Sequence, residues 1–524
     1  MFAAVKGPQQ LFSHKILLQL FIAFLSNPDA RLANLAFACV SRFKLPYLVP
    51  YAEYIRPMLK KEGLREALTK FDLSIDSETV DSEHRLPLMP IVTRILFGRL
   101  AARGNGAKSS KDSPAARRAA ILSFLSGVGN TSGELNYFLY MMVRTFIPRE
   151  ETIWMDVMAN QNDRLKELIE LSGNITVYGL MSIPLKRQEG FLKLLSDVIT
   201  QVGFGVKGFV GTFISLLLAL SEQSEEALVK SIKNQELNNM ANEDENETDL
   251  HEDNYQNGSI RTLSFLRLAG IFNKFATTTD FSMYGKRLWK SMHSSIIALP
   301  NTVINAENTP SLLRLLECIA SHPTMIPLLA QCDDAIIAVF KSIAGTTRTK
   351  VMNSVLRFID CLLTDGDSND ENGDENEMCL GHSLVLKHIH LLIAQFTKRL
   401  QTESNIANLD GEVNGGSRKG FKQPPLEGLQ LNILCRVTEL LVSAKAADEE
   451  NVSTMESLCR LLVPLLKFDS NPNQLYLVRT INSLIPNLSS DASMTHFHSL
   501  SKVRRSKCVR FQGFQLFLSC VIIF

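Results

Sequence analysis

The chain has 524 residues, and its 55 Lys and Arg against 54 Asp and Glu give a formal net charge of +1. This balance excludes a histone-like or arginine-rich protein whose net charge drives nucleic-acid binding. Hydrophobic residues make up 45% and charged residues 21%, which excludes a wholly disordered chain. The nine cysteines show no paired Cys-x-x-Cys spacing, a usage typical of a reducing compartment.

The first apolar stretch, Ile16 to Leu25, follows His14 and Lys15 and could imitate a secretory signal. Gln19 interrupts the stretch, and the sequence continues through residues 27–29 into a second periodic segment instead of a small-residue cleavage site. The pattern therefore predicts an ordinary core helix rather than a signal peptide.

A turn at residues 26–29 separates two predicted helices. Pro28 cannot continue the first helix, and Asp29 can cap the second, which is rich in Ala and begins near Arg31. This order is typical of HEAT-type helical pairs. The apolar positions at helical spacing are Leu17, Leu20, Phe21, Phe24 and Leu25 in the first helix and Leu32, Leu35, Ala36, Cys39 and Val40 in the second.

Helical periodicity continues along most of the chain. A similar Asp-Ser-Pro turn opens an Ala-rich segment at 112–120. Strand signals are almost absent, since no Asn-Gly turn joins two alternating β-branched runs. The predicted fold class is therefore all-α, an irregular HEAT-like α-solenoid with disordered acidic loops. Further helical segments are predicted at 190–220, 260–275, 311–319, 336–363, 384–400, 426–442 and 455–466.

Polar stretches divide this array. Residues 236–253 hold eight acids and no Lys or Arg, and residues 365–377 hold seven acids and no base, so neither stretch can bury enough apolar surface to become ordered. The predicted organisation is helical-repeat segments at 1–235, 260–364 and 381–500, an acidic disordered linker at 236–259, an acidic loop at 365–380, a polar loop at 411–425 and a tail at 501–524.

The tail is basic over 503–510 and apolar over 511–524. We predict an incomplete helix or an aberrant end of the sequence, with a tail anchor as the alternative. No transmembrane helix is predicted, because the apolar runs at 209–220 and 511–524 are shorter than the roughly 20 residues that a bilayer span needs.

Three motifs resemble binding sites for a dinucleotide, zinc or calcium, but each departs from the pattern that its ligand requires. Residues 203–208 satisfy Gly-x-Gly-x-x-Gly, but they follow a helical segment and not the strand of a dinucleotide site, so a turn between helices is predicted. Cys379, His382, His388 and His390 are zinc-ligand types at unsuitable helical spacing. The loop from Asp365 lacks the Gly and Glu of a calcium-binding loop.

The region between Arg94 and Arg118 concentrates positive charge around a Gly-Asn-Gly turn, with Asp112 as its one acid. Such a cluster can attract phosphate in a neutral chain. The sequence alone favours a simpler interpretation. The region is then a solvated connector between two helices, and the aliphatic parts of its Arg side chains pack on those helices. The candidate RNA-contacting residues are Arg94, Arg99, Arg103, Lys108, Lys111, Arg117 and Arg118.

The same region carries a family resemblance. Glu83 to Leu100 (EHRLPLMPIVTRILFGRL), Arg117 to Gly127 (RRAAILSFLSG), Arg261 to Trp289 and Pro310 to Leu329 resemble the down-regulated-in-metastasis family, the very large HEAT-repeat component twenty of the small-subunit processome. The resemblance implies a nucleolar α-solenoid that binds pre-ribosomal RNA and processome proteins. It also implies that this chain is an internal piece of a longer protein.

The predicted function is a non-catalytic scaffold in small-subunit rRNA processing and ribosome biogenesis. The alternative is a HEAT-type adaptor that binds protein cargo without RNA. We predict no enzymatic activity, cofactor, metal, membrane contact or small-molecule substrate, because no hydrolase, metalloprotease or kinase motif occurs in the sequence.

Overall fold

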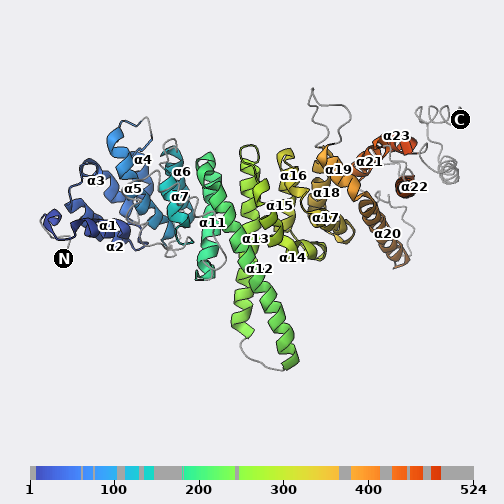
Figure 1. Cartoon of the computed structure of the whole chain (residues 1–524), viewed down its shortest axis with the longest axis horizontal. Coiled ribbons are helices and arrows are strands. Elements are labelled where there is room, and N and C mark those ends of the chain that lie inside the picture. Colours follow the sequence, from blue (N-terminus) through green and yellow to red (C-terminus); the bar gives the residue numbers. More distant parts are fainter. Residues whose placement is uncertain are drawn as a thin grey trace. The chain divides into compact units, whose positions relative to one another are not determined.

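In a computed structural model of the chain, every regular element of the described residues is an α-helix or a 3-10 helix (Figure 1). This confirms the predicted all-α class, while the HEAT assignment stays a prediction. The helices form two units, residues 1–271 and 272–524, and helix α13 crosses the boundary between them. The structure describes residues 7–60, 63–74, 77–102, 113–128, 135–146, 180, 182–241, 247–364, 379–413, 428–444, 449–463 and 474–484.

The first unit is built from helices of very different length. Its elements are η2 (Pro8–Gln10), α1 (His14–Phe24), α2 (Ala30–Arg42), η3 (Val49–Tyr51), α3 (Ala52–Ile55), η4 (Arg56–Leu59), α4 (Leu64–Lys70), α5 (Ser82–Ala101), α6 (Pro114–Val128), α7 (Asn136–Val143), α11 (Leu185–Gln201), η6 (Gly203–Phe209), α12 (Val210–Ala241) and α13 (Glu247–Phe275).

The predicted turn between the first two helices is confirmed in detail. The Asp29 carboxylate accepts a hydrogen bond of 2.8 Å from the Arg31 amide and so caps α2. Helix α5 lies directly against this turn, since a Cβ on Gly98 would meet the backbone of Ser26 and Asn27 at 3.0 Å. Gly98 therefore permits a close approach that a larger residue would obstruct.

The predicted apolar faces of α1 and α2 are partly wrong. Helix α1 forms as expected, yet Ile22 is its one buried residue. On α2 the buried face contains Ala33 and Phe37, whereas Leu32 and Leu35 are exposed. Each of the two exposed leucines is next in sequence to a buried residue of the same helix. Neighbouring residues are 100° apart around the helix axis, and periodicity alone does not resolve this difference.

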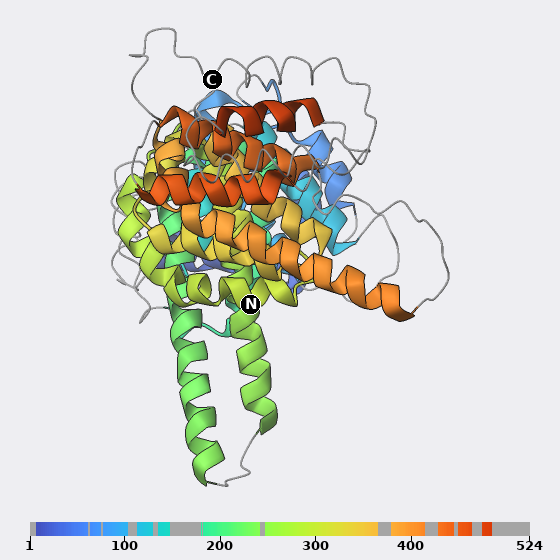
Figure 2. The same ribbon diagram turned by 90° about the vertical axis from the view of Figure 1, so that its right-hand side faces the viewer.

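The predicted acidic linker at 236–259 differs from the structure. The backbone is helical to Ala241 in α12 and again from Glu247 in α13. These two helices lie side by side (Figure 2), and the Arg261 guanidinium pairs with the Glu225 carboxylate at 3.1 Å. Glu, Leu, Gln, Met and Ala all have good helix propensity, so a segment that cannot form a core can still extend a packed helix.

The second unit consists of shorter helices joined by tight turns. Its elements after α13 are η7 (Ser282–Tyr284), α14 (Gly285–Ile304), α15 (Ser311–Ala320), η8 (Pro323–Met325), α16 (Ile326–Leu329), α17 (Asp333–Gly345), α18 (Thr349–Thr364), α19 (Leu380–Lys387), α20 (Ile389–Val413), α21 (Gly428–Ser443), α22 (Glu449–Leu462) and α23 (Gln474–Leu484).

These helices pack in two series. Helices α14, α17 and α20 contact one another in succession, and α15, α18 and α21 form a parallel succession beside them. Both series contribute fully buried side chains, among them Leu316 of α15, Phe340 of α17 and Phe358 of α18. Each helix therefore buries its apolar face against its neighbours along the series, as expected for stacked helical repeats.

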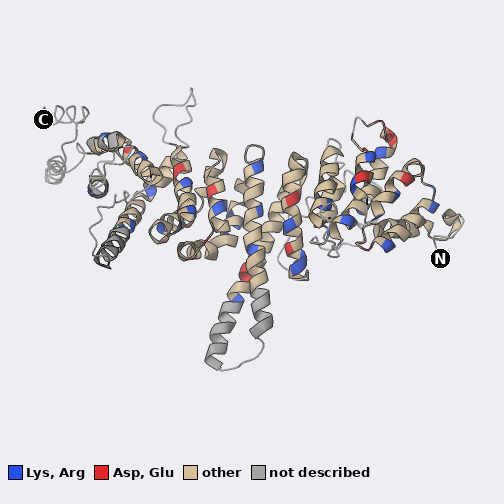
Figure 3. Ribbon diagram, turned by 180° about the vertical axis from the view of Figure 1, so that it is seen from behind, with Lys and Arg blue, Asp and Glu red and all other residues tan. Residues whose placement is uncertain are grey.

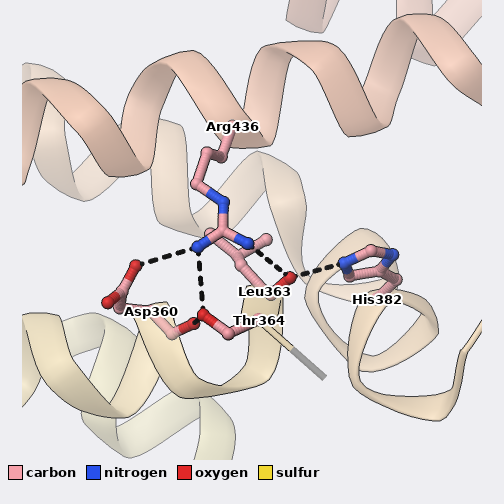
Figure 4. A network of polar contacts seen from close by, with 5 residues as sticks. All are labelled: Asp360, Leu363, Thr364, His382 and Arg436. Carbon is pink, nitrogen blue, oxygen red and sulfur yellow. Dashed lines mark hydrogen bonds and ion pairs between the residues drawn. The ribbon is translucent and has the colours of Figure 1, made fainter. Parts of the chain in front are cut away.

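Arg436 ties helix α21 to helix α18 (Figure 4). Its guanidinium donates to the Asp360 carboxylate at 3.1 Å, to the Thr364 hydroxyl at 3.0 Å and to the Leu363 carbonyl at 2.8 Å. The His382 ring bonds to the same carbonyl at 2.7 Å. The last carbonyls of a helix have no partner within the helix, so Arg436 satisfies the end of α18.

Three predicted features lie largely or wholly outside the described residues. They are the acidic loop at 365–380, of which residues 379–380 are described, the polar loop at 411–425, of which residues 411–413 belong to α20, and the tail at 501–524.

Candidate nucleic-acid interface

The seven candidate basic residues do not form one solvated loop. Arg94 and Arg99 belong to helix α5, which Asp81 caps by accepting from the Glu83 amide at 3.2 Å. Both side chains are inside the first unit, with 4% and 3% of their surface exposed. The two residues are therefore not part of a solvated connector, because they belong to a helix that contacts α1, α6 and α7.

Arg94 lies beside an aromatic pair on helix α7. Its guanidinium carbon is 5.3 Å from the centre of the Tyr137 ring, within the range of a cation–π interaction. Burial raises the pKa of Tyr137, and the positive charges of Arg94 and Arg144 oppose that rise. The pKa of Arg144 is lowered, first by burial and then by the charge of Arg94. The two arginines therefore share one interior site with tyrosines.

Arg99 connects α5 to two preceding turns. It donates hydrogen bonds to the Leu59 carbonyl at 3.3 Å and to the Pro28 carbonyl at 3.5 Å. Burial lowers its pKa and the neighbouring charge of Arg117 adds to this effect, while Asp29 opposes it. Its guanidinium is thus engaged inside the first unit.

Arg117 and Arg118 lie near the start of helix α6, which begins at Pro114, and are partly exposed. Arg117 donates to the Ala102 carbonyl at 2.7 Å, at the end of α5. Arg118 pairs with Asp197 on α11 at 3.5 Å. Arg103, Lys108 and Lys111 lie outside the described residues.

Arginines that bond to backbone carbonyls at or just beyond helix ends recur among the described residues of both units, and the charge pattern of the sequence does not reveal them. Arg85 donates to the carbonyls of Leu73 and Val128, both at 2.8 Å, and Arg399 donates to the Thr346 carbonyl at 2.6 Å. Figure 3 shows Lys and Arg spread over the helices of both units. A guanidinium matches the negative end of a helix dipole and its unpaired carbonyls, so part of the positive charge serves to hold helices together.

Residues 1–512 match the family model described as U3 small nucleolar RNA-associated protein 20, N-terminal. The chain belongs to this family. The U3 small nucleolar RNA-associated protein 20 of Schizosaccharomyces pombe is 22% identical to it over 504 residues, which are 93% of this chain and 18% of that protein. The chain thus spans about a fifth of the relative's length. The resemblance seen in the sequence is confirmed.

In this member of the U3 small nucleolar RNA-associated protein 20 family, the Gly-rich motif is a turn. Residues Gly203–Phe209 form the 3-10 helix η6 between α11 and α12, with Gly203 at a φ of +68°. This confirms the predicted turn between helices. A left-handed backbone at this position favours glycine without any ligand.

The histidines near Cys379 have separate partners. The His388 ring lies 3.5 Å from the Asp333 carboxylate, and the His390 ring bonds to the Thr454 hydroxyl. Cys379 accepts a hydrogen bond from the His382 amide at 3.4 Å and so caps α19. In the described part of the chain no three His, Cys, Asp or Glu side chains form a group that could hold a metal ion.

Among the described residues one helical segment, Gly203–Lys230, has the length and apolar composition needed to cross a membrane. In this structure 67% of its most apolar window is buried, as in the core helix of a globular protein. The bent pair Ser311–Ala320 and Pro323–Leu329 passes the same test if it is taken as one span. The apolar run at 209–220 is shorter than this segment, because η6 and the first part of α12 form one helical stretch of 28 residues.

Proposed function

We propose that the chain is part of a non-catalytic helical scaffold in small-subunit ribosome biogenesis, where it binds pre-ribosomal RNA and processome proteins in the nucleolus. The family match over residues 1–512 carries this proposal, because the family is named for association with U3 small nucleolar RNA. Stacked helices such as those of the second unit are typical of proteins that bind macromolecular partners along their length.

The competing function is an adaptor that binds protein cargo without RNA. To separate the two, the tagged chain is expressed in cells beside a nucleolar marker and crosslinked to RNA before purification. We expect nucleolar staining and recovery of pre-ribosomal RNA above the level of a tag-only control. Cytoplasmic staining without pre-ribosomal RNA would contradict the scaffold function and favour the adaptor.

For phosphate contact we propose a smaller set than the seven candidate residues. Arg94, Arg99 and Arg117 use their guanidinium groups inside the first unit. Arg103, Lys108 and Lys111, between α5 and α6, remain as candidates together with the partly exposed Arg118. Phosphate contacts by such residues fix position and carry little base specificity.

Changing Arg103, Lys108 and Lys111 together to Glu should weaken binding to unrelated single-stranded RNAs to a similar degree. If all three contact phosphate, the slope of log affinity against log salt should fall by about 2, since each contact contributes about 0.7. Fluorescence anisotropy across a salt titration measures both effects. The charge-matched control changes the exposed Lys286, Lys290 and Lys341 to Glu. Equal slopes for the two variants would assign the effect to net charge alone.

A further inference from the structure

Helix α14 of the second unit exposes one continuous stripe of residues. The members are spaced by three, four or seven positions, so at 100° per residue they lie within an arc of about 60°. All of them are exposed, Ile297 by 63% and Ile304 by 43%. The opposite side of the helix is packed, since Leu288, Met292 and Leu299 are buried. The stripe consists of Lys286, Lys290, His293, Ile297 and Ile304.

Helix α17 runs beside α14 in the same direction and extends this surface. The start of α14 lies at the turn before α17, because the Trp289 indole donates to the Leu328 carbonyl at 3.0 Å. At the other end, a Cβ on Gly345 of α17 would lie 2.8 Å from Cγ1 of Ile304. Lys341 is exposed and precedes Gly345 by one turn, so it lies on the same side of α17. We call the stripe together with Lys341 the α14–α17 surface.

The charge of the α14–α17 surface is positive. Helix α14 contains three Lys and Arg and no acid over its whole length. The acids nearest to it in sequence, Asp280 and Glu307, are exposed and lie beyond its two ends. On α17 the acids Asp333 and Asp334 occupy the first turn, about two turns from Lys341, and Asp333 is already paired with the lysine at the end of α19. Carboxylates of a partner therefore complement the surface.

We infer that the α14–α17 surface binds an acidic amphipathic helix of a partner protein. Ile297 and Ile304 are about 10 Å apart along α14, which matches apolar residues seven positions apart on a partner helix. Carboxylates beside that apolar row would lie near Lys341 on one flank and near Lys286 and Lys290 toward the start of α14.

A nucleic acid fits this surface less well than a protein helix. Its phosphates would pair with the lysines but leave both isoleucines uncovered, whereas an amphipathic helix covers the isoleucines and pairs with the lysines at once. The inference concerns the second unit and does not depend on the phosphate contacts proposed between α5 and α6.

The test titrates the full chain into two fluorescent 18-residue peptides and follows their anisotropy. Both peptides have Leu at helical i, i+3, i+4 and i+7 positions, and the other positions are Glu in one peptide and Lys in the other. We expect the acidic peptide to bind roughly tenfold more tightly than the basic one. The change Ile297→Asn removes an apolar contact without adding charge, so it should weaken binding of the acidic peptide about fivefold.

The variant Lys286→Glu with Lys290→Glu reverses the charge of the stripe and leaves both isoleucines in place. It should prefer the basic peptide over the acidic one. The matched controls are Lys15→Glu with Lys70→Glu, and Val49→Asn, which make the same kinds of change at exposed positions of the first unit. Each control should bind both peptides like the parent chain, and circular dichroism confirms that every variant keeps its helix content.

Equal affinity of the parent chain for the two peptides would overturn the inference, as would unchanged binding of the acidic peptide by the Ile297→Asn variant. A single-stranded RNA that displaces the acidic peptide, and that the Lys286→Glu and Lys290→Glu variant no longer binds, would assign the surface to nucleic acid. Dimerisation in analytical ultracentrifugation that Ile297→Asn abolishes would assign it to a second copy of the chain. None of these results alters the recovery of pre-ribosomal RNA that tests the scaffold function.

Discussion

Replacing Arg99 by Glu is expected to lower the free energy of unfolding of the first unit by about 3–5 kcal/mol, the range for leaving a buried charge without its partner. The side chain is 3% exposed, and its neighbours are the carbonyl oxygens of Leu59 and Pro28. A carboxylate at this position would face those oxygens in place of a donor. Urea unfolding followed by circular dichroism, with amide exchange across α5, measures the loss.

Arg99→Met is the informative control for this prediction. Methionine fills a similar volume and removes the buried charge, whose pKa is already lowered by burial and by Arg117. We expect a loss below about 1.5 kcal/mol, since apolar replacement of a buried ion is often close to neutral. A Glu variant as stable as the Met variant would show that Arg99 reaches solvent.

This result bears directly on tests of RNA binding. A variant that reverses Arg99 together with Arg103, Lys108 and Lys111 should lose RNA affinity through destabilisation of α5, whether or not the other three residues contact RNA. Arg103, Lys108 and Lys111 lie outside the described residues, so changing these three positions alone alters none of the contacts of α5 given above.

Arg436→Ala is expected to destabilise the joint between α18 and α21 by about 2–4 kcal/mol. The substitution removes three hydrogen bonds and leaves Asp360 and the Leu363 carbonyl with fewer donors in a partly buried site (Figure 4). Amide exchange in α18 and α21 should report the loss locally. A double-mutant cycle with Asp360→Asn should give a coupling energy of about 1–2 kcal/mol.

Arg357 provides the matched control in the same series of helices. It pairs with Glu317 at 3.8 Å, but its side chain is 67% exposed. Arg357→Ala should therefore cost less than about 1 kcal/mol, as exposed ion pairs usually do. Equal losses of stability for Arg357→Ala and Arg436→Ala would contradict this expectation. The hydrogen bonds of Arg436 to the end of α18 would then stabilise the packing of α18 against α21 no more than an exposed ion pair does.

The sequence by itself determined many of the helices and several of their boundaries, although not the helical backbone within 236–259. Asp29 was predicted as the cap of α2 and accepts from the Arg31 amide, and residues 203–208 form the predicted turn. Capping, proline placement and apolar periodicity act over one or two turns, so the residues nearby in sequence contain the necessary information. The all-α class follows from the same local signals.

Tertiary structure decided what the charged and apolar faces do. Arg94 and Arg99 became interior residues because tyrosine rings and carbonyl oxygens from distant segments lie beside them. The exposure of Leu20 and Leu35 likewise depends on which helices pack against α1 and α2. A single sequence records the charge or hydropathy of a side chain, whereas its solvation depends on partners far along the chain, and these are brought together only by packing.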